Sequence, residues 1–401
     1  MDVPQTRVDW RSKGFWLPGE EMSAGDYAAA RPSLFDGGFT WPLMVLRRDA
    51  AEKNIATMAE YTRRHGLDFA PHAKTTMAPG LLAAQFEAGA WGMTVATPNQ
   101  ALVLRRLGVE RVLIANEVLD STALRWLAQE GEAGWQVWFQ VDSIAGVQAA
   151  WASGGPVRVL VELGHDKGRT GVRTLDELEA VARAAEAAPG VRLAGVTAYE
   201  GQLQTQQEVD DFLDLLVAGV KRLQRKNLLG ESPLVSAGGS AWFDRVVDRL
   251  KALPEAARVV LRSGASVTHD DGYYRERTPF LRVPAEGPLA AALEVWAQVQ
   301  SVPEPGLAIA GMGKRDAPVD EGLPVALTIR RVDGSESAAT GVTVTKLNDH
   351  HTYLSTGDVM LTPGDLVRFG ISHPCTAFDK WRDIPVVDED RRVVDILHTY
   401  F

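Results

Sequence analysis

The chain has 401 residues, of which 45% are hydrophobic, so it is long enough to bury a large core and to form more than one domain. Its formal net charge of −10 at pH 7 and its pI near 5.4 argue against general binding to nucleic acids or anionic membranes, which favour basic surfaces. We find no apolar stretch of signal-peptide length, no window long enough to span a membrane, and one cysteine, which excludes an intrachain disulfide framework. These properties predict a cytoplasmic protein that acts on small molecules.

Short apolar runs alternate with stretches of helical periodicity through the first two thirds of the chain, which is typical of βα units around a parallel sheet. Eight such units fit a (β/α)8 TIM barrel, whereas a doubly wound open sheet would stop sooner or reverse. We therefore predict an α/β fold with a barrel over residues 38–285. The runs expected to form its strands are 67–74, 91–97, 111–116, 136–142, 157–164, 191–201, 233–239 and 257–264.

The pattern changes after about residue 285 to short β segments separated by proline and glycine. No long helical pattern occurs there, so residues 286–401 are predicted to form an antiparallel β domain. Residues 1–37 precede the barrel and are expected to pack on that β domain. The predicted strand segments are 294–302, 324–332, 341–349, 351–356, 365–372 and 393–401.

The carboxyl ends of barrel strands hold the reactive groups of this fold, and the first one ends at Lys74 in "PHAKT". The last two predicted strands end in the glycine-rich turns "SAGGS" and "RSGAS", where barrels frequently bind phosphate through backbone N–H groups. Ordinary βα loops also contain glycine, so the turns alone are a weak signal. The candidate phosphate-binding residues are Gly238, Gly239, Ser240, Gly264, Ala265 and Ser266.

A phosphate site combined with an amine at the first strand suggests pyridoxal 5'-phosphate, whose aldehyde forms a Schiff base with a lysine. Lys74 would be that lysine, although lysines at barrel rims usually only face solvent. Arg169 could neutralise an oxygen of the cofactor or form a plain surface ion pair. Tyr199 could pack on the cofactor ring or belong to the core.

At these residues the chain resembles the fold-type III pyridoxal phosphate enzymes, specifically their D-serine dehydratase and D-threonine aldolase branch. The resemblance extends from about residue 40 to the end and rests on "PHAKT", "RTGV", "AYEGQLQ", "SAGGS", "RSGAS", "LNDHH" and "SHPC". It implies an alanine racemase-like barrel, a Schiff base on Lys74 with His72 at the cofactor, and Arg169 near the cofactor's phenolic oxygen. It also implies a homodimer and favours His351 over His350 for a catalytic role, whereas the bare sequence is equally typical of two hydrogen-bonded turn residues.

His373 and Cys375 stand two residues apart, so in an extended segment both could face one metal ion. Taken alone, a buried thiol and a hydrogen-bonded loop histidine are the commoner interpretation, and two protein ligands are few for zinc. The resemblance implies a catalytic Zn²⁺ at this pair in the dehydratases, with an acidic residue replacing the cysteine in the aldolases. The thiol therefore favours a dehydratase.

The sequence thus predicts a lyase that dehydrates and deaminates D-serine or a related β-hydroxy D-amino acid. Retro-aldol cleavage of D-threonine or another 3-hydroxy D-amino acid is the nearest alternative, and racemisation is another. A carrier of pyridoxal phosphate without catalysis is an alternative of a different class. The 116 residues of the predicted β domain argue against a carrier, because carriers resemble the barrel alone.

Overall fold

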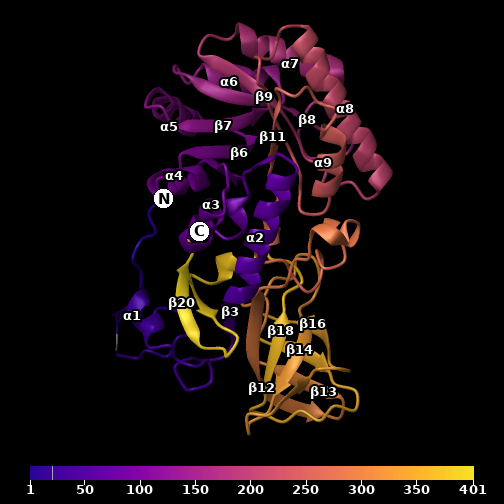
Figure 1. Ribbon diagram of the computed structural model, residues 1–401. Helices are drawn as coiled ribbons and strands as arrows, with labels where there is room; N and C mark the ends of the chain where they lie inside the picture. Colours follow the sequence, from indigo (N-terminus) through magenta and orange to yellow (C-terminus); the bar gives the residue numbers. More distant parts are fainter. Residues whose placement is uncertain (20) are drawn as a thin grey trace. The chain divides into compact units, whose positions relative to one another are not determined.

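The structure is a computed structural model that describes residues 1–19 and 21–401 (Figure 1). The chain divides into two compact units. The first, here called the barrel unit, contains residue 1 and residues 58–74 and 85–264, and the second, the β unit, contains residues 2–57, 75–84 and 265–401. The domain boundaries expected at residues 38 and 286 remain predictions.

The barrel unit is built on an eight-stranded parallel sheet with the order β4-β11-β10-β9-β8-β7-β6-β5. The ends of this sheet meet through a parallel bridge between His72 and Thr94, which nearly closes the ring. Each strand coincides with one of the eight predicted runs, with β6 extending one residue beyond its run, so the predicted barrel is confirmed. The strands are β4 (Asp68–Phe69), β5 (Met93–Val95), β6 (Arg111–Glu117), β7 (Gln136–Val141), β8 (Val157–Leu163), β9 (Val191–Ala198), β10 (Leu234–Ala237) and β11 (Arg258–Leu261).

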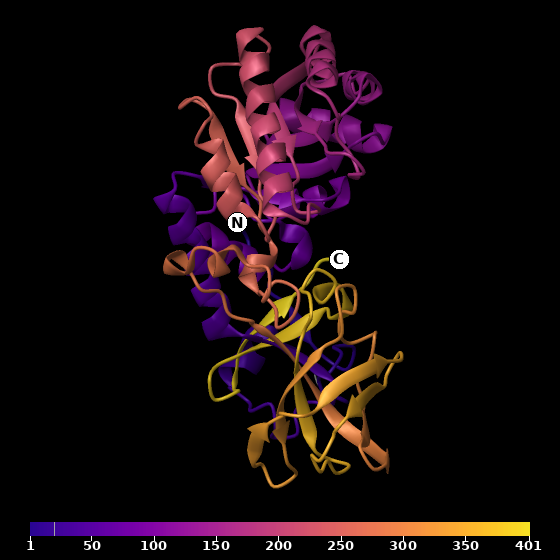
Figure 2. The same ribbon diagram turned by 90° about the vertical axis from the view of Figure 1, so that its right-hand side faces the viewer.

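Helices alternate with these strands and lie on the outside of the sheet (Figures 1 and 2). Thr174 and Thr205 are the N-caps of two of them and form capping boxes, in which the side chain of a glutamate three residues later accepts a hydrogen bond from the backbone of the cap. The helices of the barrel unit are α4 (Pro98–Arg106), α5 (Ser121–Glu132), α6 (Ile144–Trp151), α7 (Leu175–Ala187), α8 (Gln206–Arg225) and α9 (Phe243–Leu250), while α2 (Arg48–Arg64) and α3 (Pro79–Glu87) include residues of both units.

The side chains inside the barrel form an apolar layer followed by a polar one. Leu113, Trp138 and Leu160 belong to the apolar cluster together with Ala70, Leu234 and Val260. Side chains in a strand alternate between faces, so residues two positions after Trp138 and Leu160 also point inward. These are Gln140 and Glu162, and both are buried. The carboxyl end of the barrel is therefore lined by polar groups.

The β unit contains a ten-stranded, mostly antiparallel sheet, which confirms the predicted C-terminal antiparallel β fold. Its main path runs β15-β14-β18-β12-β13-β17-β16, and β3 pairs with β12 and β19. The sequence analysis did not predict β3, β13, β15 or β19. The strands are β3 (Leu43–Arg47), β12 (Leu293–Glu304), β13 (Leu307–Ala310), β14 (Val325–Arg330), β15 (Glu336–Ala338), β16 (Thr343–Leu347), β17 (Thr352–Ser355), β18 (Leu366–Gly370), β19 (Asp383–Val387) and β20 (Val393–His398).

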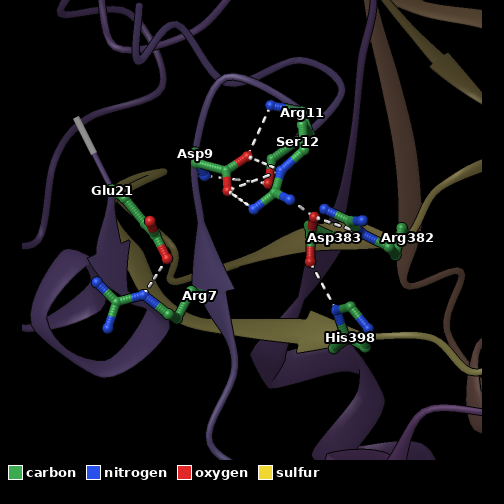
Figure 3. Close-up of polar contacts among 8 residues, drawn as sticks. All are labelled: Arg7, Asp9, Arg11, Ser12, Glu21, Arg382, Asp383 and His398. Atoms are coloured by element: carbon green, nitrogen blue, oxygen red, sulfur yellow. Dashed lines mark hydrogen bonds and ion pairs between the residues drawn. The ribbon is translucent and has the colours of Figure 1, made fainter. Parts of the chain in front are cut away.

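The N-terminal residues of the β unit lie beside its C-terminal strands, as the indigo and yellow ribbons show in Figure 1. They form β1 (Arg7–Val8), β2 (Met22–Ser23) and α1 (Ala24–Ala29). The hydroxyl of Ser12 donates to Asp383 at 2.8 Å, and His398 contacts the other oxygen of this buried carboxylate at 2.8 Å (Figure 3). The two ends of the chain are thereby joined through one aspartate.

The motif "GMGKRD" at residues 311–316 has a structural role in the β unit. Its aspartate, Asp316, is buried, accepts a hydrogen bond from the Gly313 amide at 2.9 Å, and lies 2.8 Å from the Lys13 ammonium. Lys13 also lies 3.8 Å from the centroid of the Trp381 ring, whose Nε1 donates to the Asp316 carbonyl at 2.8 Å. The motif thus anchors the N-terminal segment.

No helix within residues 1–19 and 21–401 is both long and apolar enough to cross a membrane.

Candidate active site

Lys74 lies where the sequence analysis placed it, at the carboxyl end of the first barrel strand. It is the middle residue of a 3-10 turn, Ala73–Thr75, that follows β4. His72, two residues earlier, makes the bridge to Thr94 that joins β4 to β5. The closure of the ring therefore fixes the backbone on which Lys74 stands.

Positive charges gather around His72. Its pKa lies well below the ordinary value because the ring is desolvated and because Lys74, Arg262 and Arg169 place cationic groups nearby. His72 is therefore neutral, and its Nδ1 atom is buried without a hydrogen-bond partner among the described residues. Three cations and an unsatisfied polar atom at a barrel mouth suit an anionic cofactor.

Arg169 and Tyr199 contact each other, as expected of two groups that serve one site. The guanidinium carbon of Arg169 lies 4.5 Å from the centroid of the Tyr199 ring, a cation–π contact. Arg169 is exposed in the loop after β8, and both residues line a small pocket with Glu162 and His165. A planar ring could stack in this position, although the contact also stabilises the loop by itself.

The backbone amides of the glycine turn after β10 are bonded to a side chain of the protein, so they are not free to bind phosphate. The amides of Gly238 and Gly239 donate to the carboxylate of Glu200, at 3.1 and 2.6 Å. Gly238 has a φ of +102°, which favours glycine. Ser240 follows directly, ahead of α9. Glu200 is buried, and the sequence analysis gave it no role.

Gly264 ends the barrel unit, and its neighbours explain the glycine. A Cβ atom at this position would lie 2.5 Å from the carbonyl oxygen of His72. Two backbones thus approach each other closely at the base of the Lys74 turn. The next two predicted phosphate residues, Ala265 and Ser266, begin a 3-10 turn in the β unit and are buried.

A buried charged network at the carboxyl end of the barrel was missed by the sequence analysis. Arg262 is buried and donates to the Thr197 hydroxyl and, at 2.6 Å, to the Ala198 carbonyl. Desolvation lowers the pKa of Arg262, against the opposing influence of the Glu200 and Glu162 carboxylates. Arg262 follows a strand directly in the sequence, so its position could have identified it.

Two glutamates, Glu117 at the end of β6 and Glu162 near the end of β8, form the acidic part of this network. Burial and the adjacent Glu162 carboxylate raise the pKa of Glu117 to about 8. Both carboxylate oxygens of Glu117 and one of Glu162 are buried without a hydrogen-bond partner in the part of the chain that the structure describes. Glu162 interrupts the apolar run "VRVLVELG", which was an available signal.

His373 and Cys375 lie close together in the β unit. The Nδ1 atom of His373 is 2.6 Å from Asp320. Burial would lower the pKa of His373, but the Asp320 hydrogen bond and the neighbouring Cys375 raise it to about 10. The sulfur of Cys375 is 3.9 Å from the hydroxyl of Thr75, which follows Lys74 in the chain.

The donor set fits a two-ligand metal site. Metal-binding histidines commonly give one ring N–H to a carboxylate and coordinate with the other nitrogen, which here is Nε2. Imidazole and thiolate are ligands that zinc accepts. Within residues 1–19 and 21–401, no group of three or more His, Cys, Asp or Glu side chains could hold a metal ion. Further coordination positions would thus be filled by water or substrate.

His351 lies in a turn before β17 and is exposed. Its carbonyl accepts a hydrogen bond from the Asn348 amide at 2.8 Å, which closes the turn. Its role in catalysis remains a prediction, because the structure gives its side chain no contact with the other candidate residues.

Comparison with known proteins agrees with this arrangement. The family model "Alanine racemase, N-terminal domain" matches residues 46–255, and "Putative serine dehydratase domain" matches residues 292–387. Fold and site define a fold-type III pyridoxal phosphate enzyme with an alanine racemase-like barrel. Within that class, the chain belongs to the alanine racemase N-terminal domain family and to its D-serine dehydratase and D-threonine aldolase branch.

Individual relatives are similar over most or half of the chain. The 3-hydroxy-D-aspartate aldolase of Paracoccus denitrificans (strain Pd 1222) is 27% identical, covering 86% of this chain and 87% of its own. The D-threo-3-hydroxyaspartate dehydratase of Delftia sp. (strain HT23) is 30% identical over 50% of this chain and 55% of its own. The crystal structure of D-threonine aldolase from Filomicrobium marinum is 25% identical, covers 90% of this chain and 95% of its own, and has a TM-score of 0.76.

Proposed function

We propose that this protein is a pyridoxal phosphate- and zinc-dependent lyase that dehydrates and deaminates D-serine or a related β-hydroxy D-amino acid to a 2-oxo acid and ammonia. The observation that carries the proposal is the His373 and Cys375 pair, oriented by Asp320 and in contact with the residue after Lys74. The names of the relatives support a D-amino acid with a 3-hydroxyl group.

The cofactor would be held by the residues of the barrel mouth. Lys74 supplies the amine, the cations around His72 balance the phosphate charge, and the Tyr199 ring offers a surface for the pyridine. When bound, pyridoxal phosphate withdraws the electrons that are left when a bond to Cα breaks. We also propose that Gly264, Ala265 and Ser266 bind the phosphate, with Ser240, while Glu200 keeps the preceding glycine turn in shape.

Residues of the chain would take the Cα proton, hold the zinc ion and orient a metal-binding histidine. Lys74 has the reach and chemistry of a base and would take the Cα proton at its Nζ atom. His373 and Cys375 would hold a zinc ion, whose Lewis acidity assists departure of the β-hydroxyl, a poor leaving group. Asp320 would keep the His373 ring in the orientation that presents Nε2.

Retro-aldol cleavage is the second candidate, because two of the relatives named above are aldolases. In that reaction the β-hydroxyl loses its proton and the bond between Cα and Cβ breaks, giving glycine and an aldehyde. Cys375 distinguishes the two proposals, since an acidic residue would be expected in an aldolase. Racemisation would change optical purity without net breakdown, and a carrier would show no turnover.

Product analysis tests the proposal. Purified holoenzyme is incubated with D-serine, D-threonine and D-threo-3-hydroxyaspartate, with and without added zinc. Oxo acid and ammonia in equal amounts are expected, whereas glycine and an aldehyde as the main products would reject the dehydratase. The variant Cys375→Asp should lose oxo acid formation, while Asp390→Asn, an exposed acid, serves as the matched control.

Two further measurements test the cofactor and metal assignments. Lys74→Ala should reduce turnover by more than about 10³-fold and abolish the visible absorbance of the bound cofactor at about 420 nm. A chelator should abolish turnover and leave that absorbance in place. We also propose a homodimer in the cytoplasm, and sedimentation of the purified holoenzyme tests its mass.

A further inference from the structure

A second pocket lies at the opposite end of the barrel from Lys74. Its cavity volume is about 550 Å³, within the range of small-molecule sites. Its charged lining residues and one tryptophan lie near the amino ends of strands: Trp91 precedes β5, while Arg158, Arg192 and Arg258 stand at the starts of β8, β9 and β11. The catalytic end of the barrel is formed by the other ends of the same strands.

Two arginines of this pocket are adjacent and lack acidic partners. Arg158 and Arg192 are direct partners in the register of β8 and β9, where like charges oppose each other. Arg158 donates to the Trp135 carbonyl at 3.0 Å, and neither arginine pairs with a carboxylate among the described residues. Arg258 differs, because Asp68 lies 2.6 Å from it.

Arg158 lies in an environment that disfavours its positive charge. Burial and the charge of Arg192 both hold its pKa below the ordinary arginine value. A protein with a net charge of −10 thus keeps two uncompensated cations next to one another in a cavity. An anion between them would relieve the repulsion and could accept hydrogen bonds from both guanidinium groups.

Aromatic rings complete the lining. Trp91 and Trp138 both line the pocket, with ring centroids 5.3 Å apart and an angle of 36° between the rings. The Arg258 guanidinium lies 5.3 Å from the Trp91 ring. Indole and guanidinium planes side by side favour a flat ligand. Glu231 is the acidic residue of the lining, and it is exposed.

We infer that this cationic pocket is a binding site for a small planar organic anion, an aromatic ring that carries a phosphate or a carboxylate. The site is independent of the proposed lyase activity, because none of its residues lies at the carboxyl ends of the strands. Adenosine monophosphate represents the aromatic phosphates, benzoate represents the aromatic carboxylates, and inorganic phosphate represents the anion without a ring.

Titration calorimetry on the holoenzyme tests the inference. Adenosine monophosphate or benzoate should bind with one site per chain, and higher salt should weaken binding. Arg192→Gln, which changes an exposed residue, should weaken binding by roughly fivefold or more, and Glu231→Gln should tighten it by roughly twofold. Arg183→Gln removes an exposed arginine of α7 outside the pocket and should change the Kd by less than about twofold.

Three results would overturn the inference. One is no binding of either aromatic anion at millimolar concentration. Another is equal weakening by Arg192→Gln and Arg183→Gln, which indicates general charge attraction. The third is binding of inorganic phosphate as tight as that of both aromatic anions, which removes the role of the tryptophans. Turnover of the proposed substrates should be unchanged in Arg192→Gln, so failure of one proposal does not affect the other.

Discussion

Glu117 illustrates how a single buried acid can make the stability of a fold depend on pH. Its carboxylate oxygens are out of contact with water, and the Glu162 carboxyl group lies beside it, so burial first and Glu162 second raise its pKa. The folded chain holds a proton there up to a pKa of about 8, whereas the unfolded chain releases it near the ordinary value of 4.5. Proton binding is therefore tied to folding.

This linkage predicts the sign of the pH dependence. Because the folded state binds the extra proton, the contribution to the free energy of unfolding is complete below about pH 4.5 and is lost as the pH rises towards about 8. Glu117→Gln should remove this slope and stabilise the apoprotein at about pH 8 by on the order of 2 kcal/mol, once screening by solvent is allowed for. Urea unfolding across this pH range measures the effect.

Glu110→Gln is the matched control for this experiment, since Glu110 is an exposed glutamate close in the sequence. Its stability profile should follow that of the unchanged protein. A parallel slope in Glu117→Gln would show that Glu117 does not hold the proton.

For single residues, the sequence predicts which side chains stand at the ends of barrel strands better than it predicts their hydrogen-bond partners. Lys74, Arg169 and Tyr199 could be proposed from the sequence because each follows an apolar run, and their roles remain predictions. Glu200 could not, because its role depends on the Gly238 and Gly239 amides, which follow the next strand of the chain and lie near it only because β9 and β10 pair.

Among the elements, the turn after β11 shows why one glycine is needed. Gly264→Ala would place a methyl group 2.5 Å from the His72 carbonyl oxygen, so one of the two backbones must move. We expect a loss of about 2–4 kcal/mol in the free energy of unfolding and weaker cofactor binding. Thermal unfolding and titration with pyridoxal phosphate measure these effects.

Gly230→Ala is the control for this substitution, because nothing lies within 4 Å of a Cβ atom at that glycine. It should be neutral or slightly stabilising. Equal loss in both variants would mean that the close approach at Gly264 is not the cause.

The glycine turn after β10 depends on hydrogen bonds to Glu200. Glu200→Gln replaces one of the two acceptor oxygens by an amide NH₂, which cannot accept from a backbone N–H. Cofactor affinity should fall by about tenfold, with turnover per bound cofactor less affected. The exposed Glu255→Gln should leave affinity unchanged. Unchanged affinity in Glu200→Gln would show that the turn does not depend on this carboxylate.

Strands were predictable where hydrophobic runs alternate regularly with helical patterns. All eight barrel strands were identified, because helical patterns separate successive apolar runs; the last strand, β11, is followed by 3-10 turns instead of a helix. In the β unit, β19 contains Pro385, which argues against a strand in sequence analysis, and β3 lies before the barrel with no neighbouring β segment to suggest a sheet. Both segments form strands because they pair with strands that are remote in the sequence.

On the scale of the whole molecule, Asp383 connects the N-terminal and C-terminal segments of the chain within the β unit. Burial alone would raise its pKa, but hydrogen bonds from His398 and Ser12 outweigh this and lower it. Asp383→Asn should lower the free energy of unfolding by on the order of 2 kcal/mol at neutral pH. The difference should shrink as the pH falls through the folded pKa, because protonation then removes the same charge.

Urea unfolding at neutral and acidic pH measures this effect, and the exposed Asp390→Asn is the control. A difference that stays constant down to acidic pH would show that the carboxylate charge is not what holds the N-terminal segment.

The barrel is completed by very few contacts between its first two strands. Among the described residues, and besides the bridge at His72, the hydrogen bonds are from the Trp91 amide to the Phe69 carbonyl, from the Thr94 amide to the Pro71 carbonyl, and from the Thr94 hydroxyl to the Ala70 carbonyl. This is the thinnest join in the ring, and it stands immediately before Lys74. Transient opening there would displace the backbone of Lys74, so the rate of hydrogen–deuterium exchange at the Thr94 amide should report how often the proposed Schiff-base lysine leaves its position.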